Sequence, residues 1–440
     1  MRLRGTMRIN EEGHLEVGGV STLDLAKEFG TPLYVIDEAL FRENCRRYRA
    51  AFGPDNRVVY AGKALMCAAI CRMIDEESLY LDVVSGGELY TALSARFPAE
   101  RIYFHGNNKS EDEIRQGICA GVGRFVVDSL DELHILDRVA GEEGARPEVL
   151  LRITPGIEAH THDYIRTGQI DSKFGLPIST GQALKGVRRT MDSHNVKLVG
   201  LHCHIGSQIF DLEPFREAAR VILGFASEVR DSTGWLPEEL DLGGGLGIYY
   251  VSGDDPPLIE DYAQAITGAV RDTCALLGMP LPRVVVEPGR SIAGPAGSTL
   301  YTVGVVKEIP GVRRYVAVDG GMGDNPRPAL YQAQYEAVLA ARIKDNSAVA
   351  VTVAGKCCES GDVLIQTAHL PCPETGDLLL IPATGAYNYT MSMNYNRLPR
   401  PAMVLVKDEK AEIIVARESY EDLVRNDRVP ESLWKLSPRT

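Results

Sequence analysis

The stretch RVVYAGKAL, residues 57–65, places a lysine just after a short apolar run. Val58 to Ala61 are typical of a buried strand, whereas the charged amine of Lys63 would be costly to bury unpaired. The same pattern of an apolar run, a small or polar cluster and a helical stretch returns along the chain. The runs are RVVYAGK, LYLDVVSGGE, RIYFHGNNK, RFVVDS, EVLLRITPG, LVGLHCHIGS, LDLGGGLG and RVVVEPGR.

Strands that alternate with helices predict a parallel sheet. Eight such units in about 230 residues match a (β/α)8 TIM-type barrel, in which active sites lie at the carboxyl ends of the strands. We therefore expect an α/β barrel, with a doubly wound open sheet as the alternative. The residues at the predicted strand ends are Lys63, Ser85, Asn107, Asp128, Arg152, His204, Gly243 to Gly245, Glu287 and Arg290.

The character of the sequence changes after about Arg290. Runs from STLYTVGVVKEI to AEIIVARE are β-rich and separated by turn residues, which predicts an all-β C-terminal domain. The N-terminal TPLYVID is expected to add a strand to it. The predicted bounds are 1–36 for the N-terminal segment, 37–290 for the barrel and 291–440 for the β domain. The long interval from 157 to 193 is a candidate active-site loop.

Length, charge and cysteines limit the function classes. A chain of 440 residues favours two domains. The net charge of −13, without a basic run, argues against nucleic acid or an anionic membrane as partner. No apolar run approaches the ~20 residues of a transmembrane helix, and no signal peptide is visible. Nine scattered cysteines indicate reduced thiols, so we expect a cytoplasmic protein.

The glycine-rich turn DLGGGLG, residues 241–247, follows the seventh run. Loops at this place in a barrel often bind phosphate through backbone N–H groups, although a tight turn that needs positive φ is the alternative. The turn does not match a dinucleotide or P-loop motif. Together with Lys63 and Glu287 it indicates pyridoxal phosphate: the amine forms the Schiff base, the turn holds the phosphate, and Glu287 keeps the ring nitrogen protonated.

Eight motifs in order resemble the diaminopimelate decarboxylase family, which belongs to the barrel-type (fold III) pyridoxal phosphate decarboxylases. They are YAGKAL, LDVVSGGEL, HCHIGSQ, LDLGGGLG, EPGRSI, DGGMGDNPRPALY, CCESGDVL and GAYNYTMSMNYN. The resemblance implies decarboxylation of an amino acid, meso-2,6-diaminopimelate, to L-lysine as the last step of lysine biosynthesis. It also implies a homodimer with shared active sites. THDYIRTGQIDSKFG, residues 161–175, resembles the active-site loop of the family.

Two departures from the commonest family pattern are visible. Gly62 and Leu65 in the first motif, and Lys356 and Cys357 in the seventh, replace the usual residues. None of them is a proposed catalytic group, so the departures question only the local packing.

The resemblance implies a set of cofactor residues. Lys63 binds the cofactor covalently, His204 stacks on its ring, Glu287 faces the ring nitrogen, and Asp82 is a supporting acid. The other implied cofactor residues are Ser207, Gly243, Gly244, Gly245, Gly289, Arg290 and Tyr387.

A second implied set holds the substrate. Arg290, Arg327 and Tyr331 are implied to bind the distal carboxylate, for which an arginine fork is geometrically suited, and Tyr387 belongs to the same set. Glu359 is implied to bind the distal amine. From the residues alone, Arg327 could equally be a surface turn residue between two prolines.

The proton donor is implied to be a cysteine. A thiol at Cys358 is a plausible donor to the carbanion near neutral pH. Cys358 and Glu359 are implied to reach the active site of the partner subunit. From the residues alone, Cys357 and Cys358 could be small core residues.

Several alternatives are weighed against this interpretation. The nearest is a decarboxylase of the same fold acting on ornithine, arginine or lysine, which Glu359 and the arginine of NPRPALY disfavour. A carboxynorspermidine-type decarboxylase is disfavoured for the same reason, and a racemase because it lacks the CESGD element. Loss of Lys63, Glu287 or Cys358 would indicate a non-catalytic homologue, but all are present. The HCH sequence at 202–204 lacks further ligands at useful spacing, so no metal is predicted.

Overall fold

Eight parallel strands close into a barrel, as the sequence predicts. The computed structural model describes residues 2–157, 172–345 and 347–434. Each strand pairs with its neighbour, and the pairings β13–β5 and β8–β9 close the ring, which excludes the open-sheet alternative. The barrel strands are β5 (Arg57–Ala61), β6 (Tyr80–Val83), β7 (Ile102–Phe104), β8 (Arg124–Val127), β9 (Glu148–Thr154), β11 (Lys197–His202), β12 (Glu239–Asp241) and β13 (Arg283–Val286).

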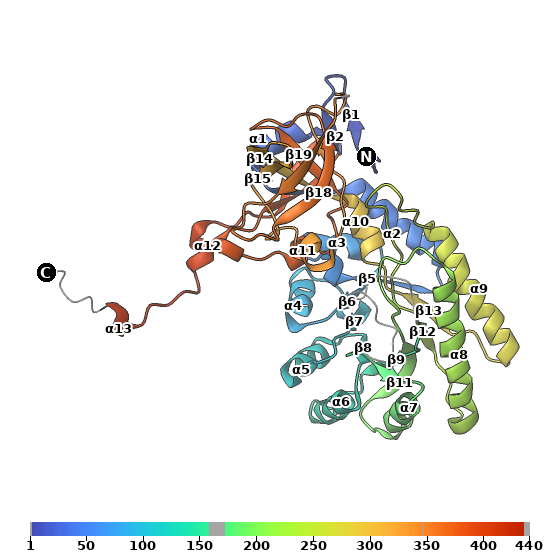
Figure 1. Ribbon diagram of the computed structural model, residues 1–440. Coiled ribbons are helices and arrows are strands. Elements are labelled where there is room, and N and C mark those ends of the chain that lie inside the picture. Colours follow the sequence, from blue (N-terminus) through green and yellow to red (C-terminus); the bar gives the residue numbers. More distant parts are fainter. Residues whose placement is uncertain (1, 158–171, 346, 435–440) are drawn as a thin grey trace.

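Helices cover the outside of the barrel (Figure 1). They are α2 (Glu38–Phe52), α3 (Ala68–Glu76), α4 (Gly86–Ser94), α5 (Glu111–Ala120), α6 (Leu130–Glu142), α7 (Gln182–Asp192), α8 (Glu213–Thr233), α9 (Ile259–Leu277) and α10 (Arg290–Ala296). Serines start several of them: the side chains of Ser85, Ser110 and Ser129 accept a backbone N–H of the first turn. Ser85, one of the predicted strand-end groups, is therefore a helix cap.

The inside of the barrel is a small apolar layer. It consists of Val59, Tyr103, Val126, Leu150, Val199 and Val285, while the alternate residues of the same strands pack against the helices. Successive residues of a strand point to opposite faces. The residues that follow this layer at even spacing, such as Lys63 after Val59, His105 after Tyr103 and Glu287 after Val285, therefore face inward above it. This alternation positions the candidate site.

A charged cluster closes the opposite, amino-terminal end of the barrel. Glu239 is only 1% exposed. Its carboxylate accepts hydrogen bonds from Arg124 Nη2 at 2.7 Å and Tyr103 OH at 2.9 Å, and it also pairs with Arg57. A buried carboxylate stays ionised only if such donors pair with it. This cluster therefore contributes to the stability of the fold and takes no part in the candidate site.

The second domain is a mainly antiparallel sheet, which includes one strand from near the N-terminus. Its strand order is β18-β17-β15-β14-β4-β20-β21; off this path, β19 pairs with β14, and β16 pairs with β19. The bounds are β4 (Leu33–Asp37), β14 (Gly297–Ile309), β15 (Arg313–Val318), β16 (Val338–Leu339), β17 (Val349–Ala354), β18 (Val363–Leu370), β19 (Leu378–Pro382), β20 (Ala402–Lys407) and β21 (Lys410–Val415). All five residues of β4 are buried between β14 and β20, so the predicted N-terminal strand is confirmed. The domain bounds at 36/37 and 290/291 stay a prediction.

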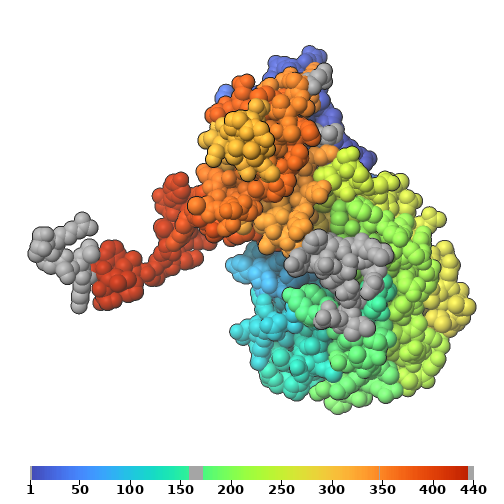
Figure 2. Space-filling view, viewed as in Figure 1, coloured from blue at the N-terminus to red at the C-terminus, as the bar shows by residue number. Residues whose placement is uncertain are grey.

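The remaining elements lie at the edges of the two domains. They are β1 (Arg8–Ile9), β2 (Leu15–Val17), β3 (Val20–Ser21), α1 (Thr22–Phe29), β10 (Leu176–Pro177), α11 (Arg327–Tyr331), α12 (Tyr420–Val424) and α13 (Glu431–Trp434). The segment with α12 and α13 extends away from the body of the molecule (Figures 1 and 2). No helix in the described part of the chain is long and apolar enough to cross a membrane.

Candidate active site

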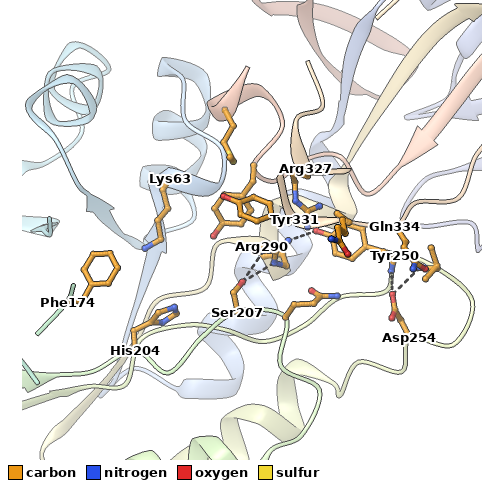
Figure 3. Close-up of a pocket in the computed structure, with 16 residues that line it drawn as sticks. Lys63, Phe174, His204, Ser207, Tyr250, Asp254, Arg290, Arg327, Tyr331 and Gln334 are labelled. Atoms are coloured by element: carbon orange, nitrogen blue, oxygen red, sulfur yellow. Dashed lines mark hydrogen bonds between the residues drawn. The ribbon is translucent and has the colours of Figure 1, made fainter. Parts of the chain in front are cut away.

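A cavity of about 680 Å3 lies at the carboxyl ends of the barrel strands, against the β domain. The barrel contributes Lys63, His204 and Ser207 to its lining, and the β domain contributes Arg327 and Tyr387. Figure 3 shows Lys63, His204 and Phe174 around one end and the arginines with Tyr250 and Tyr331 around the other. The cavity therefore has an amine end and an arginine end.

Lys63 provides the amine. It lies in the 3-10 turn Gly62–Ala64 after β5, and its Nζ is 3.2 Å from Asp82 Oδ2. Burial opposes the positive charge, but the carboxylates of Asp82 and Glu287 outweigh it and raise the pKa of Lys63. The side chain is 41% exposed while that of Asp82 is fully buried. The charged amine is thus held from below and reaches the cavity.

Glu287 lies buried below this end of the cavity between two histidines. Its Oε2 is 3.3 Å from His202 Nε2, and its Oε1 is 2.6 Å from His105 Nε2. Burial alone would raise the pKa of Glu287, but the two imidazoles outweigh it and hold the pKa well below its usual range. Neither histidine was assigned a role from the sequence. The prediction of Asn107 as the end of strand β7 is wrong, because this strand ends at Phe104. Alternation along β7 is the signal in the sequence that points His105 inward.

His204 lines the cavity beside Lys63. Burial, aided by the charge of Lys63, lowers the pKa of His204 well below its usual value, so the ring is neutral. Gly244 N donates to its Nδ1 at 3.3 Å. Cys203, between the two histidines in sequence, packs into the core between barrel and helices, as strand alternation predicts.

Each glycine of the turn after β12 is required by the backbone. Gly243 and Gly245 have φ values of 67° and 124°. A Cβ at Gly244 would lie 2.1 Å from the backbone oxygen of Glu287, and one at Gly245 would lie 2.5 Å from that of Gly206. The tight-turn interpretation therefore holds for the conformation, and phosphate binding by the turn stays a prediction.

Arg290 links the barrel to the arginine end of the cavity. Its Nε and Nη2 donate to Ser207 Oγ at 3.2 and 3.0 Å, and its Nη1 donates to Tyr250 OH at 2.6 Å. The residue before it, Gly289, allows α10 to approach the lysine turn, because a Cβ there would lie 2.9 Å from Ala61 Cβ.

Arg327 lies beside it and is only 6% exposed, so the surface-turn alternative is wrong. Its guanidinium is 4.7 Å from the ring of Tyr250 and donates to Tyr335 OH. Burial would raise the pKa of Tyr250, but the positive charges of Arg290 and Arg327 outweigh it and lower the pKa. Tyr250 was not among the predicted site residues, and its place in the sequence just after the glycine turn carried no clear signal.

Tyr331 and Tyr387 complete the lining predicted for this region. Tyr387 has a left-handed backbone with φ of 62°, and its N–H donates to Ala64 O at 2.8 Å. This contact ties the GAY segment of the β domain to the turn that carries Lys63. The guanidinium of Arg290 is 4.8 Å from the ring of Tyr387.

Cys358 and Glu359 are not among the described residues that line the cavity. Both are exposed, and Cys358 N donates to Asn396 Oδ1 at 2.6 Å. Asp362 fixes the start of their loop, because its carboxylate accepts the N–H of Met322 at 2.7 Å and that of Cys357 at 2.8 Å. The single chain therefore brings together the other predicted site residues but not these two.

The predicted active-site loop is described only in part. Residues 158–171, with the HTH sequence at 160–162, lie outside the described residues. Beyond them, Phe174 lines the cavity, and its ring is 4.2 Å from the guanidinium of Arg152. The later part of the interval forms β10 and α7.

The residues present fit the predicted cofactor, pyridoxal phosphate. Asp82 Oδ1 and Glu287 Oε1 are buried oxygens without a hydrogen-bond partner in the described part of the chain, although His105 Nε2 lies close to the latter. An amine, a buried acid behind it and a turn whose glycines leave no Cβ are the groups needed for an aldehyde, a ring nitrogen and a phosphate. No residue of the set conflicts with this ligand.

Comparisons with known proteins agree with this site. Residues 38–294 match the family described as "Pyridoxal-dependent decarboxylase, pyridoxal binding domain". Diaminopimelate decarboxylase from Bacillus subtilis is 52% identical over 430 residues, covering 97% of this chain and 98% of the relative. A crystal structure of diaminopimelate decarboxylase from M. jannaschii in complex with L-lysine has a TM-score of 0.92 at 38% identity, covering 98% and 99% of the two chains.

A second solved structure, diaminopimelate decarboxylase from Helicobacter pylori complexed with L-lysine, has a TM-score of 0.84 at 33% identity, covering 92% of this chain and 98% of that one. The sequence identity with the curated relatives extends over nearly the whole length of both proteins. The chain therefore belongs to the diaminopimelate decarboxylase family of pyridoxal phosphate-dependent enzymes.

Proposed function

We propose that the protein is a carboxy-lyase that converts meso-2,6-diaminopimelate to L-lysine and CO2, the last step of lysine biosynthesis. The observation that carries this proposal is one cavity with a charged lysine at one end and two buried arginines at the other. A substrate that fits both ends needs a reactive amino acid group and a distant carboxylate. The family relatives support the same assignment.

The amine end is proposed to hold the cofactor. Pyridoxal phosphate, when bound, supplies the electron sink that makes loss of CO2 from an amino acid feasible. Lys63 would hold it covalently with Asp82 in support, His204 would stack on its ring, and Glu287 would face its ring nitrogen.

We propose that the phosphate group of the cofactor lies over the glycine turn. The residues that would face the phosphate are Ser207, Gly243, Gly244, Gly245, Gly289, Arg290 and Tyr387. Backbone N–H groups and a guanidinium are suited to a phosphate dianion.

The arginine end selects the substrate. Arg290, Arg327 and Tyr331 would bind the distal carboxylate, because guanidinium groups form charge-assisted hydrogen bonds with carboxylates. Ornithine, arginine and lysine have no such carboxylate and would leave the buried cations unpaired. This disfavours the alternative of a basic amino acid decarboxylase, since unpaired buried polar groups strongly reduce the binding of an analogue.

A homodimer would complete the site. Cys358 and Glu359 lie on the surface of their own chain, and we infer that they enter the cavity of a partner subunit. There Cys358 would deliver the proton that replaces CO2, and Glu359 would bind the distal amine. A cytoplasmic location is part of the same proposal.

The test is CO2 release by the purified, cofactor-loaded protein offered meso-diaminopimelate, L-ornithine, L-arginine and L-lysine in parallel, with the product identified. Release from diaminopimelate alone, with L-lysine as product, is expected. Release from another of these amino acids would disprove the substrate assignment but not the cofactor site. No release from any of them, with cofactor bound, would indicate a non-catalytic homologue.

A further inference from the structure

Two histidines from distant barrel strands converge on one carboxylate. His105 follows β7, His202 ends β11, and Glu287 follows β13, yet each imidazole approaches a different oxygen of Glu287. The exposed fractions of the three residues are 5% or less. The two rings pack edge to face with their centroids 5.0 Å apart. The arrangement is buried and directed at the residue proposed to face the ring nitrogen.

We propose that His105 and His202 are positioning residues that keep Glu287 ionised and oriented toward the ring nitrogen of the cofactor. The inference rests on the cofactor part of the proposed function and is independent of the substrate. Neither histidine lines the cavity, so each acts through Glu287.

The reasoning starts from the cost of burying a carboxylate. Without donors, a buried carboxyl group takes up a proton and becomes neutral. A neutral carboxyl group at this place could not attract a protonated ring nitrogen. The charged or titratable nitrogens close to the Glu287 carboxylate come from the two histidines and from no lysine or arginine of the described residues.

The type of donor matters as much as its presence. Burial lowers the pKa of His202 to about 4, so this ring is neutral near pH 7. Its Nδ1 has no hydrogen-bond partner in the described part of the chain, which places the proton on the Nε2 that faces Glu287. A neutral N–H stabilises the carboxylate without cancelling its charge. An arginine in the same place would cancel the charge and leave little for a ring nitrogen.

Asp241 at the end of β12 does not add a second negative charge. Burial, reinforced by the charge of Glu287, raises the pKa of Asp241 well above its ordinary value, so its carboxyl group retains a proton. Its Oδ1 accepts the N–H of Gly243 at 2.9 Å. Of the two neighbouring acids Asp241 and Glu287, only Glu287 is thus ionised.

Other titratable groups also act on this layer. They are Lys63 after β5, Asp82 on β6, Arg152 on β9, His204 after β11 and Tyr262 on α9. All of them remain in the variants proposed below. A shift between variants therefore reports the histidines themselves.

The test measures cofactor binding, with no substrate present. Cofactor-free protein with His105→Leu or His202→Leu is titrated with pyridoxal phosphate between about pH 5 and 8, and the dissociation constant is obtained from the visible absorbance. We expect the constant near pH 7 to rise about tenfold in each leucine variant, because the carboxylate loses a stabilising imidazole nitrogen beside one of its oxygens. The pH below which affinity falls should rise by about one unit, because loss of a donor raises the pKa of Glu287.

Matched variants separate this role from a packing role. His202→Gln and His105→Gln retain an N–H donor and should recover most of the affinity and the parental pH profile. His134→Leu, at an exposed position of α6, should change neither. Should a leucine variant fail to fold, as judged by circular dichroism, the glutamine variant decides. It lacks the imidazole ring but keeps an N–H donor, so a parental affinity and pH profile support the inference, whereas a loss of affinity of about tenfold assigns the histidine a packing role and overturns it.

Three other results would also overturn the inference. One is an unchanged dissociation constant and pH profile in both leucine variants, which would leave the proposed function intact. Another is a stoichiometric metal in the cofactor-free protein held by His105, His202, Asp241 and Glu287, whose ligand atoms lie within 4.8 Å of one another. The third is failure of the parent itself to bind pyridoxal phosphate, which would overturn the proposed function as well.

Discussion

Replacing Arg327 by methionine should remove the selectivity of the site for a substrate with a distal carboxylate. Arg327 is 6% exposed, and its guanidinium lies 4.7 Å from the ring of Tyr250 at the arginine end of the cavity. Methionine fills most of the same volume and adds no polar group, so the change chiefly deletes the cation. At this depth water does not readily take its place.

The size of the effect follows from the hydrogen bonds lost. One hydrogen bond to a charged group contributes about 1.5–3 kcal/mol, and a guanidinium can offer two to a carboxylate. A loss of about 3 kcal/mol corresponds to roughly a hundredfold in kcat/KM, at 1.4 kcal/mol for each tenfold. A monodentate contact would give the lower limit of about tenfold.

The assay compares two substrates. Steady-state kcat/KM is measured for meso-diaminopimelate and for D-lysine, which is the same molecule without the distal carboxylate. Arg327→Met should lower the value for diaminopimelate about a hundredfold and leave that for D-lysine within about threefold, because only the former uses the cation. The exposed Arg313→Met on β15 is the control and should change neither.

An equal loss for both substrates would refute the reasoning, because Arg327 would then act on the cofactor or the fold. Thermal unfolding and the absorbance of bound cofactor, measured on the same preparation, show which of the two it is. An unchanged value for diaminopimelate would assign the distal carboxylate to Arg290 alone.

The remaining predictions concern the shared site, the tyrosine between the arginines and the base of the barrel. Lys63→Ala should abolish the cofactor-linked absorbance and turnover, whereas Cys358→Ala should keep the absorbance and lose most turnover. Mixing the two inactive proteins under subunit exchange should restore about a quarter of the parental activity if each site takes Cys358 from a partner, and none if it does not. Tyr250→Phe should raise KM for diaminopimelate about tenfold with little change in kcat, because the hydroxyl that receives Arg290 is lost; a change confined to kcat would contradict this. Glu239→Gln should destabilise the fold by about 2 kcal/mol at pH 7, a value reduced for the partial exposure of the arginine partners. Burial opposes the charge of Glu239, but Arg124 and Arg57 outweigh it and lower its pKa, so the difference from the parent in thermal unfolding should shrink as the pH falls through that value; a difference independent of pH would exclude the charge as its source.

The sequence by itself determined the architecture and the approximate positions of its strands. Short apolar runs, each followed by a helical pattern, are local features of the sequence. Each run is about as long as one buried strand. For this reason the eight barrel strands, the β-rich C-terminal half and the strand at 33–37 were predictable. Lys63, Glu287 and Arg290 were predictable with them, because a polar group just after a buried strand falls at the carboxyl end of the barrel.

Tertiary structure alone decided which of these groups meet. His105 and His202 reach Glu287 because the closed ring brings β7, β11 and β13 to one interior, and no local pattern shows that they converge. Tyr250 lies between Arg290 and Arg327, which begin two separate helices, α10 and α11.

The same distinction explains why the sequence alone did not reveal the burial of Arg327 or the exposure of Cys358. Arg327 between two prolines reads as an exposed turn, yet packing of the β domain on the barrel buries it. Cys358 follows a buried cysteine in sequence, yet it is exposed and is not among the described residues that line the cavity of its own chain. Burial is a property of the surfaces that come together, and periodicity along a chain specifies which face of an element is apolar but not which face of another element it meets.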